Sequence, residues 1–416
     1  MSRTLLAPAA YAAAHAARTG GPVPYRALRA GAWARLEAIG LPHVKLEDWR
    51  FTNPAAITQT AFADGGSAPA AIEFDGTWPE DGFLGLASVA PDGLVHALEP
   101  DILLGSIAPW AERGFVALNT ALLADAAMVK TSARAQIDTP VRLVYAPAAG
   151  DGTARATHPR TLIAAAPGSR LTVIEDFRVA QTPGDFVNAV TEILVGAGAE
   201  VEHVVLLPDA PGSFHVGGTF VRVLANGKFR TRSIALGGKL TRRDIDVTFR
   251  GEGGEAELDG LYVTTGNDLV DHHTTVDHAA PLCTSRELFK GVLAGSSRAV
   301  FNGAVIIRPG AQKSDAAQQN QNLLLSEDAM IDTKPELQIF ADDVKCAHGA
   351  TVGQLDDAAL FYLRARGIDG AAARAMLTHA FAREVVGRIS HAGLREEIDA
   401  LVEARMNAVT AGGAAS

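Results

Sequence analysis

The chain has 416 residues, of which 48% are hydrophobic and 20% charged, and a formal net charge of −10 at pH 7. This composition is typical of a globular protein with a large core, and the negative charge argues against nucleic-acid binding, which needs a basic surface. Two cysteines cannot build a disulfide framework, which fits a reducing, cytoplasmic environment.

Residues 1–130 are expected to form a mostly helical N-terminal region. The chain begins with an alanine-rich apolar stretch that Pro8 and His15 interrupt, so we expect a soluble helical start rather than a secretion signal. Tyr25 to Ile39 carries apolar residues at helical spacing, and Glu112 to Met128 can hold another helix. No run approaches the ~18 apolar residues of a membrane span, so we expect no membrane insertion.

The run EDWRFTN, from Glu47 to Asn53, is interpreted as a loop that anchors the N-terminal region to the core. In this interpretation Trp49 and Phe51 pack, and Arg50 pairs with an acid. No nucleophile or general base lies beside the run, which argues against a catalytic role.

Residues 131–353 are predicted to be a β domain. Short runs of high β propensity follow one another without a helix between them, and two of them alternate clearly: Ile245 to Phe249 and Glu255 to Val263. A sandwich, a barrel and a solenoid all fit this pattern. More than two hundred residues of β structure favour a solenoid over a single sandwich of ~100 residues, whereas the absence of a strict repeat counts against it.

Two polar runs inside this domain are interpreted as structural. In DHHTTVDH, residues 271–278, only His272 and His278 can share a face of a strand, about 20 Å apart at ~3.3 Å per residue, so hydrogen-bonded core histidines are favoured over a metal site. The amide run from Gln318 to Asn322 fits stacked amides inside or along a solenoid.

The stretch from Lys334 to Gly353 is the strongest candidate for chemistry. Cys346 and His348 are separated by one residue, so both side chains leave the same face of an extended strand. A thiolate beside an imidazole is half of a site for zinc, copper or iron, because such metals need about four ligands. A second chain would have to supply the other half, and Cys283 is interpreted as structural.

Asp342 and Asp343 precede this pair and raise the alternative of a β-helical polysaccharide lyase or hydrolase. Adjacent carboxylates on a strand point to opposite faces, whereas the acid pair of a glycosidase flanks one bond at ~5–9 Å. One of the two acids can still assist the chemistry at the Cys–His pair.

Residues 354–410 are predicted to form a C-terminal helical domain, and residues 411–416 a disordered tail. Asp356 or Asp357 can cap the first helix and Asp369 the second. Apolar residues at helical spacing give the second helix one face with Met376, Leu377, Ala380, Phe381 and Val385, and the third helix another with Leu394, Ile398, Leu401 and Val402.

The segment FADDVKCAHGATVGQLDDAALFYLRARGI, residues 340–368, resembles the C-terminal signature of the SufB/SufD family of SUF iron–sulfur cluster assembly proteins. DHHTTVDH, ELFKGVL and AVFNGAVIIRPGAQKSDAAQQNQNLLLS precede it in the order of that family, and EDWRFTN resembles the N-terminal signature. The similarity is closest to SufD and is dense over residues 271–368.

This resemblance implies a right-handed parallel β-helix core flanked by helical regions, in a cytoplasmic, non-catalytic scaffold subunit. It places Cys346 and His348 at an interface with a SufB homologue, where they would hold iron or a nascent cluster transiently. It also implies that the C-terminal helices dock the ATPase SufC, and the residues expected to contact it are Leu360, Phe361, Tyr362 and Arg366.

The resemblance implies no cofactor held tightly by the chain alone and leaves open a flavin in the complex and a homodimer of the isolated chain. No GxxxxGK[ST] motif is present, so the chain should not bind ATP by itself. A SufB-type scaffold is the alternative within the family. It would have more than two cysteines and an acid after the histidine, where this chain has Gly349.

Overall fold

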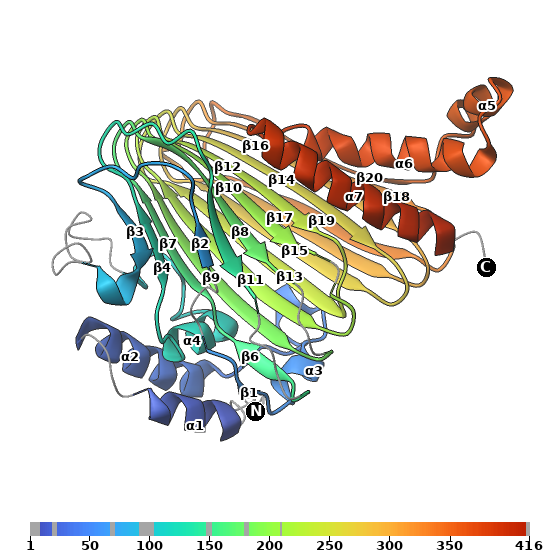
Figure 1. Cartoon of the computed structure of the whole chain (residues 1–416). Helices are drawn as coiled ribbons and strands as arrows, with labels where there is room; N and C mark the ends of the chain where they lie inside the picture. The colour runs from blue at the N-terminus through green and yellow to red at the C-terminus, as the bar shows by residue number, and fades with distance from the viewer. Residues whose placement is uncertain are drawn as a thin grey trace.

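The structure is a computed structural model that describes residues 9–18, 23–66, 71–90, 104–146, 152–178, 183–208 and 210–412. Its centre is a β-solenoid of about 7 turns, made of two sheets that enclose a common core (Figure 1). N-terminal helices lie at one sheet and C-terminal helices at the other. The expected mainly β fold with a parallel solenoid and flanking helices is therefore confirmed.

From β7 onwards the chain alternates between the two sheets, so that neighbouring strands of one sheet are one turn apart. The larger sheet contains β3 (Phe83–Leu86), β4 (Ala127–Lys130), β7 (Arg160–Ala165), β9 (Phe186–Val195), β11 (Phe214–Val223), β13 (Leu240–Phe249), β15 (Leu269–His278), β17 (Arg298–Ile307) and β19 (Met330–Ile339), with β1 (Ala63–Asp64) and β6 (Arg155–Thr157) at its side. The smaller sheet contains β2 (Ala71–Glu73), β5 (Val141–Tyr145), β8 (Arg170–Phe177), β10 (Glu200–Leu207), β12 (Lys228–Ala235), β14 (Glu255–Thr264), β16 (Thr284–Leu293), β18 (Asp315–Leu324) and β20 (Lys345–Gly353).

The length of a turn varies along the solenoid. Phe214 pairs with Leu240, which is 26 positions later, whereas Arg298 pairs with Met330, which is 32 positions later. A sequence comparison at one fixed period cannot align turns of such different lengths. This is why the sequence shows no strict repeat although the backbone repeats.

One corner of successive turns is built on a residue with a left-handed backbone. The backbone N–H of each such residue donates to a carbonyl in the corner of the next turn; Asn226, for example, donates to Glu252 at 2.8 Å. A left-handed conformation costs a residue with a Cβ roughly 1–2 kcal/mol, so the stacked hydrogen bonds must offset that cost. In the described part of the chain the column consists of Arg134, Gly168, Gly198, Asn226, Gly253, Leu282 and Lys313, with φ between 56° and 70°.

Strand alternation decides which side chains fill the lumen between the sheets. Ile245, Val247 and Phe249 of β13 point into it, and so do Ala256 and Leu258 of β14, as their alternation predicts. These residues are stacked on their counterparts from the turns before and after, because the strands pair in register. The apolar stacks form a single core along the solenoid.

The two ends of the solenoid differ. At the N-terminal end β2 and β3 run antiparallel to their neighbours β5 and β4 and close the sheets. At the other end β19 and β20 pair with no further strand among the described residues. Exposed apolar side chains lie there, namely Met330, Ile339, Phe340 and Val352. This open end presents free strand edges together with apolar surface.

The N-terminal region contains α1 (Ala9–Ala17), α2 (Val23–Ile39), α3 (Ala55–Thr58) and α4 (Gly114–Ala121), with two short 3-10 turns, η1 (Glu47–Trp49) and η2 (Ala87–Val89). Helix α2 confirms the helix predicted from Tyr25 to Ile39. The helix expected between Glu112 and Met128 ends at Ala121, because the chain enters the solenoid as β4 at Ala127.

The C-terminal helices are α5 (Asp357–Ala365), α6 (Gly370–Val386) and α7 (Ala392–Gly412). The side chains of Asp356 and Asp369 cap α5 and α6, as predicted. Helix α7 continues to Gly412, and the rest of the predicted tail, residues 413–416, lies outside the described residues. Within the described part of the chain, no helix combines the length and apolarity needed to cross a membrane.

The buried face of α6 matches the predicted one only in part, at Val385, which is buried, and at Phe381, which packs half-buried against the same cluster. Ala373, Thr378, Ala382, Val385 and Val386 are buried, whereas the Met376 side chain is exposed. Helices α6 and α7 pack on the outer surface of the smaller sheet, and Ala382, Val385 and Val386 are the buried α6 residues of the shared apolar cluster. The predicted apolar face of α7 agrees better with the structure: Leu394, Ile398 and Val402 are buried, and of the four predicted residues only Leu401 is exposed.

A buried ion pair holds the N-terminal region on the larger sheet. Arg160 and Glu192 are both fully buried, and their side chains meet at 2.5 Å. The other oxygen contacts of Glu192 are backbone N–H groups of the covering segment at Gly105, Ile107 and Ala108. Both oxygens of the Glu192 carboxylate therefore accept hydrogen bonds from other parts of the protein.

Glu192→Ala should destabilise the fold strongly, because it leaves the Arg160 charge and three backbone N–H groups without their acceptor. We expect a loss of about 3–5 kcal/mol in the free energy of unfolding, measured by urea denaturation. Asp138→Ala is the matched control: it removes the partner of Arg170 at the surface and should cost about 0–1 kcal/mol. Equal effects of the two substitutions would contradict this account.

Candidate metal centre at the open end of the solenoid

Cys346 and His348 lie on β20, the last strand of the smaller sheet. The register pairs Cys346 with Ala316 and His348 with Gln318 on β18. Ala316 and Gln318 are both buried on the lumen side, so the thiol and the imidazole share that side. The sequence prediction that both side chains leave one face is confirmed, and the face is the mouth of the lumen at the open end.

The two side chains differ in exposure. His348 is exposed, while Cys346 is half-buried against the apolar cluster of Val305, Ile307 and Ala316. Burial raises the pKa of the Cys346 thiol, and the charge of Asp315 raises it further. The neutral thiol is therefore favoured until a metal ion or a cationic group approaches it.

Among the described residues, no group of three or more His, Cys, Asp or Glu side chains is placed to hold a metal ion. Asp342 and Asp343 are exposed in the bend before β20, rather than on a strand as the sequence suggested. Cys283 is fully buried and its sulfur donates to the carbonyl of Gly251 at 3.4 Å, which fits its structural interpretation. The chain thus offers two soft donors, an incomplete set.

Beneath the mouth, a buried carboxylate lines the lumen. Glu287 of β16 lies one strand below Gln318 in register, accepts a hydrogen bond from Gln318 Nε2 at 3.1 Å and another from Thr274 at 2.6 Å. Burial raises the pKa of Glu287 to about 7, although both hydrogen bonds act in the opposite direction. Sequence reasoning missed this residue, because ELFKGVL is an ordinary strand pattern when its neighbours are unknown.

The amides of β18 alternate between lumen and surface. Gln318, Asn320 and Asn322 are buried, whereas Gln319 is exposed. Asn320 Nδ2 donates to the Tyr262 hydroxyl at 3.0 Å, and that hydroxyl donates to Asn322 Oδ1 at 2.5 Å. The predicted stacked amides are therefore present inside the solenoid, in an arrangement that satisfies a buried tyrosine.

The histidines of β15 are structural, as predicted. His272 and His278 are fully buried and are hydrogen bonded to Ser233 and Ser285 at 3.1 and 2.9 Å. Burial lowers the pKa of His272 to about 3, which keeps the imidazole neutral at physiological pH. Neutral core histidines with hydroxyl partners leave no reason to assign a metal to this run.

The EDWRFTN run packs on the outer surface of the larger sheet. Trp49 is buried, and the guanidinium of Arg242 lies over its ring at 4.0 Å. Thr52 donates to Asp271 at 2.6 Å, so the run is tied to the start of DHHTTVDH. The anchoring role is confirmed for Trp49. Arg50, however, is exposed and lies over the Phe51 ring; it forms no close ion pair among the described residues, although its charge, after that of Lys334, helps to lower the pKa of Glu47.

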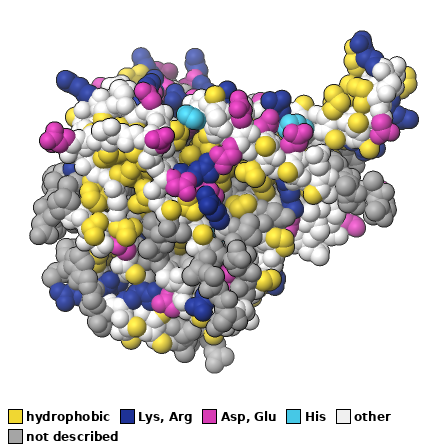
Figure 2. Space-filling model, viewed as in Figure 1, with side chains coloured by type: hydrophobic (Ala, Val, Ile, Leu, Met, Phe, Trp, Pro, Cys, Tyr) yellow, Lys and Arg dark blue, Asp and Glu magenta, His cyan; other side chains and the backbone are white. Residues whose placement is uncertain are grey.

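The residues predicted to bind a partner lie on or directly after α5, which projects from the body of the molecule (Figures 1 and 2). Leu360 is buried, but the side chains of Phe361 and Tyr362 are 76% and 56% exposed. The Arg366 guanidinium lies over the Tyr362 ring at 4.5 Å. The two neighbouring aromatic rings therefore form an exposed apolar surface on a short projecting helix.

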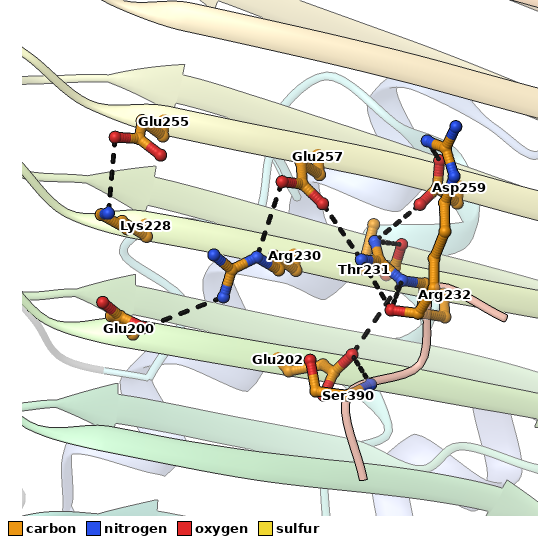
Figure 3. Close-up of polar contacts among 11 residues, drawn as sticks. Glu200, Glu202, Lys228, Arg230, Thr231, Arg232, Glu255, Glu257, Asp259 and Ser390 are labelled. Carbon is orange, nitrogen blue, oxygen red and sulfur yellow. Dashed lines mark hydrogen bonds and ion pairs between the residues drawn. The ribbon is translucent and has the colours of Figure 1, made fainter. Parts of the chain in front are cut away.

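Charged side chains fasten the α6–α7 turn to the smaller sheet (Figure 3). Arg232 of β12 contacts Asp259 of β14 at 2.9 Å, and Arg388 contacts the same carboxylate at 3.1 Å. The backbone N–H of Ser390 donates to Glu202 of β10 at 3.1 Å. The turn is thus held by three adjacent strands, and a force on the C-terminal helices would act on the sheet.

A family model described as SUF system FeS cluster assembly, SufBD core domain, matches residues 148–381. An iron–sulfur cluster assembly SufBD family protein of Synechocystis sp. is 35% identical over 300 residues, which are 70% of this chain and 66% of that protein. SufD of Escherichia coli is 35% identical over 249 residues, or 60% and 59% of the two chains. SufD of Bacillus subtilis is 29% identical over 301 residues, or 71% and 67%. The matches cover less than two thirds of the first two relatives.

Glu287 should make the stability of this protein depend on pH. Its pKa in the folded state lies above the ordinary value of 4.5, so the folded protein holds this proton more tightly than the unfolded chain. The resulting stabilisation is complete below about pH 4.5 and is lost as the pH rises through about 7. Glu287→Gln should therefore reduce the fall in unfolding free energy between pH 5 and pH 8, by up to roughly 3 kcal/mol.

Urea denaturation at the two pH values measures this difference. Glutamine at position 287 keeps an acceptor for Gln318 and can donate to Thr274, so the substitution changes the charge with little change in shape. Glu327→Gln removes an exposed carboxylate near the same end of the solenoid and is the matched control. A pH dependence that is the same in wild type and Glu287→Gln would show that this carboxyl does not titrate as described.

Proposed function

This chain belongs to the SufB/SufD family of SUF iron–sulfur cluster assembly proteins and is close to SufD, and we propose that it acts as the SufD-type subunit of a SUF scaffold complex. In this role it pairs with a SufB homologue through the open end of its solenoid and with the ATPase SufC through its C-terminal helices. It contributes ligands to nascent clusters and is not itself a catalyst.

The observation that carries the proposal is the incomplete donor set at an uncapped end. Cys346 and His348 lie at the mouth of the lumen, where β19 and β20 also leave free edges. A solenoid from another subunit that docked there would cover the apolar surface and bring further donors to the same place. Iron and sulfide would then meet a full coordination shell only at the shared interface.

The state of the thiol suits a transient role. Cys346 is held as the neutral thiol by burial, so metal binding must release a proton, and affinity for iron will fall with decreasing pH. The chain alone would hold no cofactor tightly, because two protein ligands leave most of the coordination sphere open. Iron or a cluster is therefore cargo, and a flavin, if the complex holds one, would need groups from the partner.

The C-terminal helices offer a route from ATP hydrolysis to this interface. The aromatic surface of α5 is free to bind SufC, while α6 and α7 are packed on the smaller sheet. Lys290 of β16 adds to this attachment through Glu384 at 2.5 Å. A movement of the ATPase would reach the strands that end at the open end. In isolation the same end can pair with a second copy, and the assembly would operate in the cytoplasm.

His348→Ala should lower the iron content of the complex reconstituted with the SufB and SufC homologues. The substitution removes an exposed imidazole, so it should leave folding intact while the shared site loses a ligand. We expect at least about a tenfold loss of iron affinity, measured by Fe²⁺ titration and metal analysis. Lys345→Ala, an exposed residue on the same strand, is the control. Unchanged iron loading in an intact complex would refute the role of His348.

The double substitution of Phe361→Ala and Tyr362→Ala should release SufC. Exposed aromatic side chains on a projecting helix are typical interface hot spots, and losing about 2 kcal/mol or more would weaken binding roughly 30-fold. The two rings are exposed, so the melting temperature of the isolated chain should not change. Met376→Ala removes an exposed apolar side chain from α6 and is the control. Equal recovery of SufC by all three proteins in pull-downs would place its binding surface elsewhere.

A further inference from the structure

We propose that Gln318 is a positioning residue for His348, and that its side-chain carbonyl accepts the N–H of the imidazole when the other ring nitrogen binds the metal. This inference rests on the proposed function, since it concerns the same site. It adds a residue from a second strand to the site and gives the lumen beneath the mouth a role.

The first support is the register. Gln318 is the direct neighbour of His348 on the adjacent strand, and neighbouring strands are about 4.8 Å apart. Gln318 is buried on the lumen side, and His348 leaves its strand on that side too. An imidazole that turns inward when a partner covers the open end would meet the Gln318 amide first.

The second support is an acceptor without a donor. Gln318 Oε1 is buried and has no hydrogen-bond partner among the described residues, although the Nε2 of the same amide donates to Glu287 Oε1 at 3.1 Å. A buried carbonyl without a donor costs about 1–3 kcal/mol, so it is rarely retained without a use. The bond to Glu287 also fixes which end of the amide is the carbonyl as long as Glu287 Oε1 carries no proton, because an unprotonated carboxyl oxygen can only accept a hydrogen bond.

The third support is the space made for this side chain on the opposite sheet. Gly303 of β17 faces the Gln318 head group, and a Cβ at that position would lie 2.3 Å from Gln318 Nε2. Glycine at 303 therefore allows the amide to extend across the lumen toward Glu287. Three strands, β16, β17 and β18, together hold the amide in one position under the mouth.

The arrangement has a clear chemical use. A histidine that binds metal through one ring nitrogen almost always donates its other N–H to an oxygen acceptor, which fixes the tautomer and the ring orientation. Gln318 can serve as that acceptor for His348. In this chain the acceptor is itself oriented by Glu287, so the ligand is positioned by a chain of two hydrogen bonds that begins inside the solenoid.

The test uses the complex with the SufB and SufC homologues and measures Fe²⁺ affinity and the visible spectrum of bound Co²⁺. Gln318→Met keeps the shape of the side chain and removes the acceptor, so iron affinity should fall about 10–100-fold and the Co²⁺ spectrum should shift. Gln318→Glu restores an acceptor, and Glu287 can hold the proton that separates the two carboxylates. This variant should bind iron within a few fold of wild type.

Gly303→Ala pushes on the same amide from the other sheet and should weaken iron binding while residue 318 stays glutamine. Gln319→Met lies on the same strand but faces outward, and it should have no effect. Wild-type affinity in Gln318→Met, or an equal loss in Gln318→Met and Gln318→Glu, would overturn the inference while leaving the proposed function in place. An iron affinity unaffected by His348→Ala would overturn both.

Discussion

The structure depends on the way each turn of the solenoid satisfies the backbone of the turn before it. Strands pair in parallel register on two sheets. At one corner, the backbone N–H of each left-handed residue donates to a carbonyl of the next turn, and the last of these bonds runs from Lys313 to Asp343. In such a stack each inner turn is stabilised by a neighbour on both sides, whereas a turn at either end lacks one neighbour. The N-terminal end is closed by two antiparallel strands, whereas the last turn has no successor in the described chain.

The open end of the solenoid explains why the candidate donors are accessible. On inner turns, lumen-facing side chains are covered from both sides, and the polar ones among them, such as His272 and Thr274, find hydrogen-bond partners there. On the last turn, the same positions are covered from one side only, so Cys346 and His348 combine a fixed backbone with access to a partner. Below the mouth, the side chains of Gln318 and Glu287 lie in the lumen and are hydrogen bonded to each other. The donor pair is thus rigidly held but incomplete, which suits assembly at a subunit interface.

The C-terminal helices α6 and α7 are firmly attached to the outer surface of the solenoid. Apolar contacts hold α6 and α7 on the smaller sheet, and buried charges around Asp259 fix the turn between them. Burial raises the pKa of Asp259 to about 6, although the charges of Arg232 and Arg388 beside it act in the opposite direction. Helix α5 takes no part in this packing, and the side chains of Phe361 and Tyr362 on it are exposed.

The sequence by itself determined the local features. Alternation gave the inward faces of β13 and β14, the spacing of Cys346 and His348 put them on one face, and Asp356 and Asp369 were correctly identified as helix caps. These features depend on residues close together in the chain, where the periods of strand and helix act directly. The family resemblance, rather than any pattern, selected the solenoid from three β folds.

Only the tertiary structure decided the rest. The turns vary in length, and most residues of the left-handed corner are not glycine. Successive turns therefore repeat their backbone hydrogen bonds without repeating their amino acids. The buried face of α6 was predicted only in part: Val385 is buried and Phe381 packs against the same cluster, whereas Met376 is exposed, because the sheet that α6 packs on decides which of its residues are covered. Glu287 and Gln318 are partners on paired strands although they are 31 positions apart, and Gly303 meets Gln318 across the lumen from the other sheet. Their roles arise from burial and register, which no single strand can show.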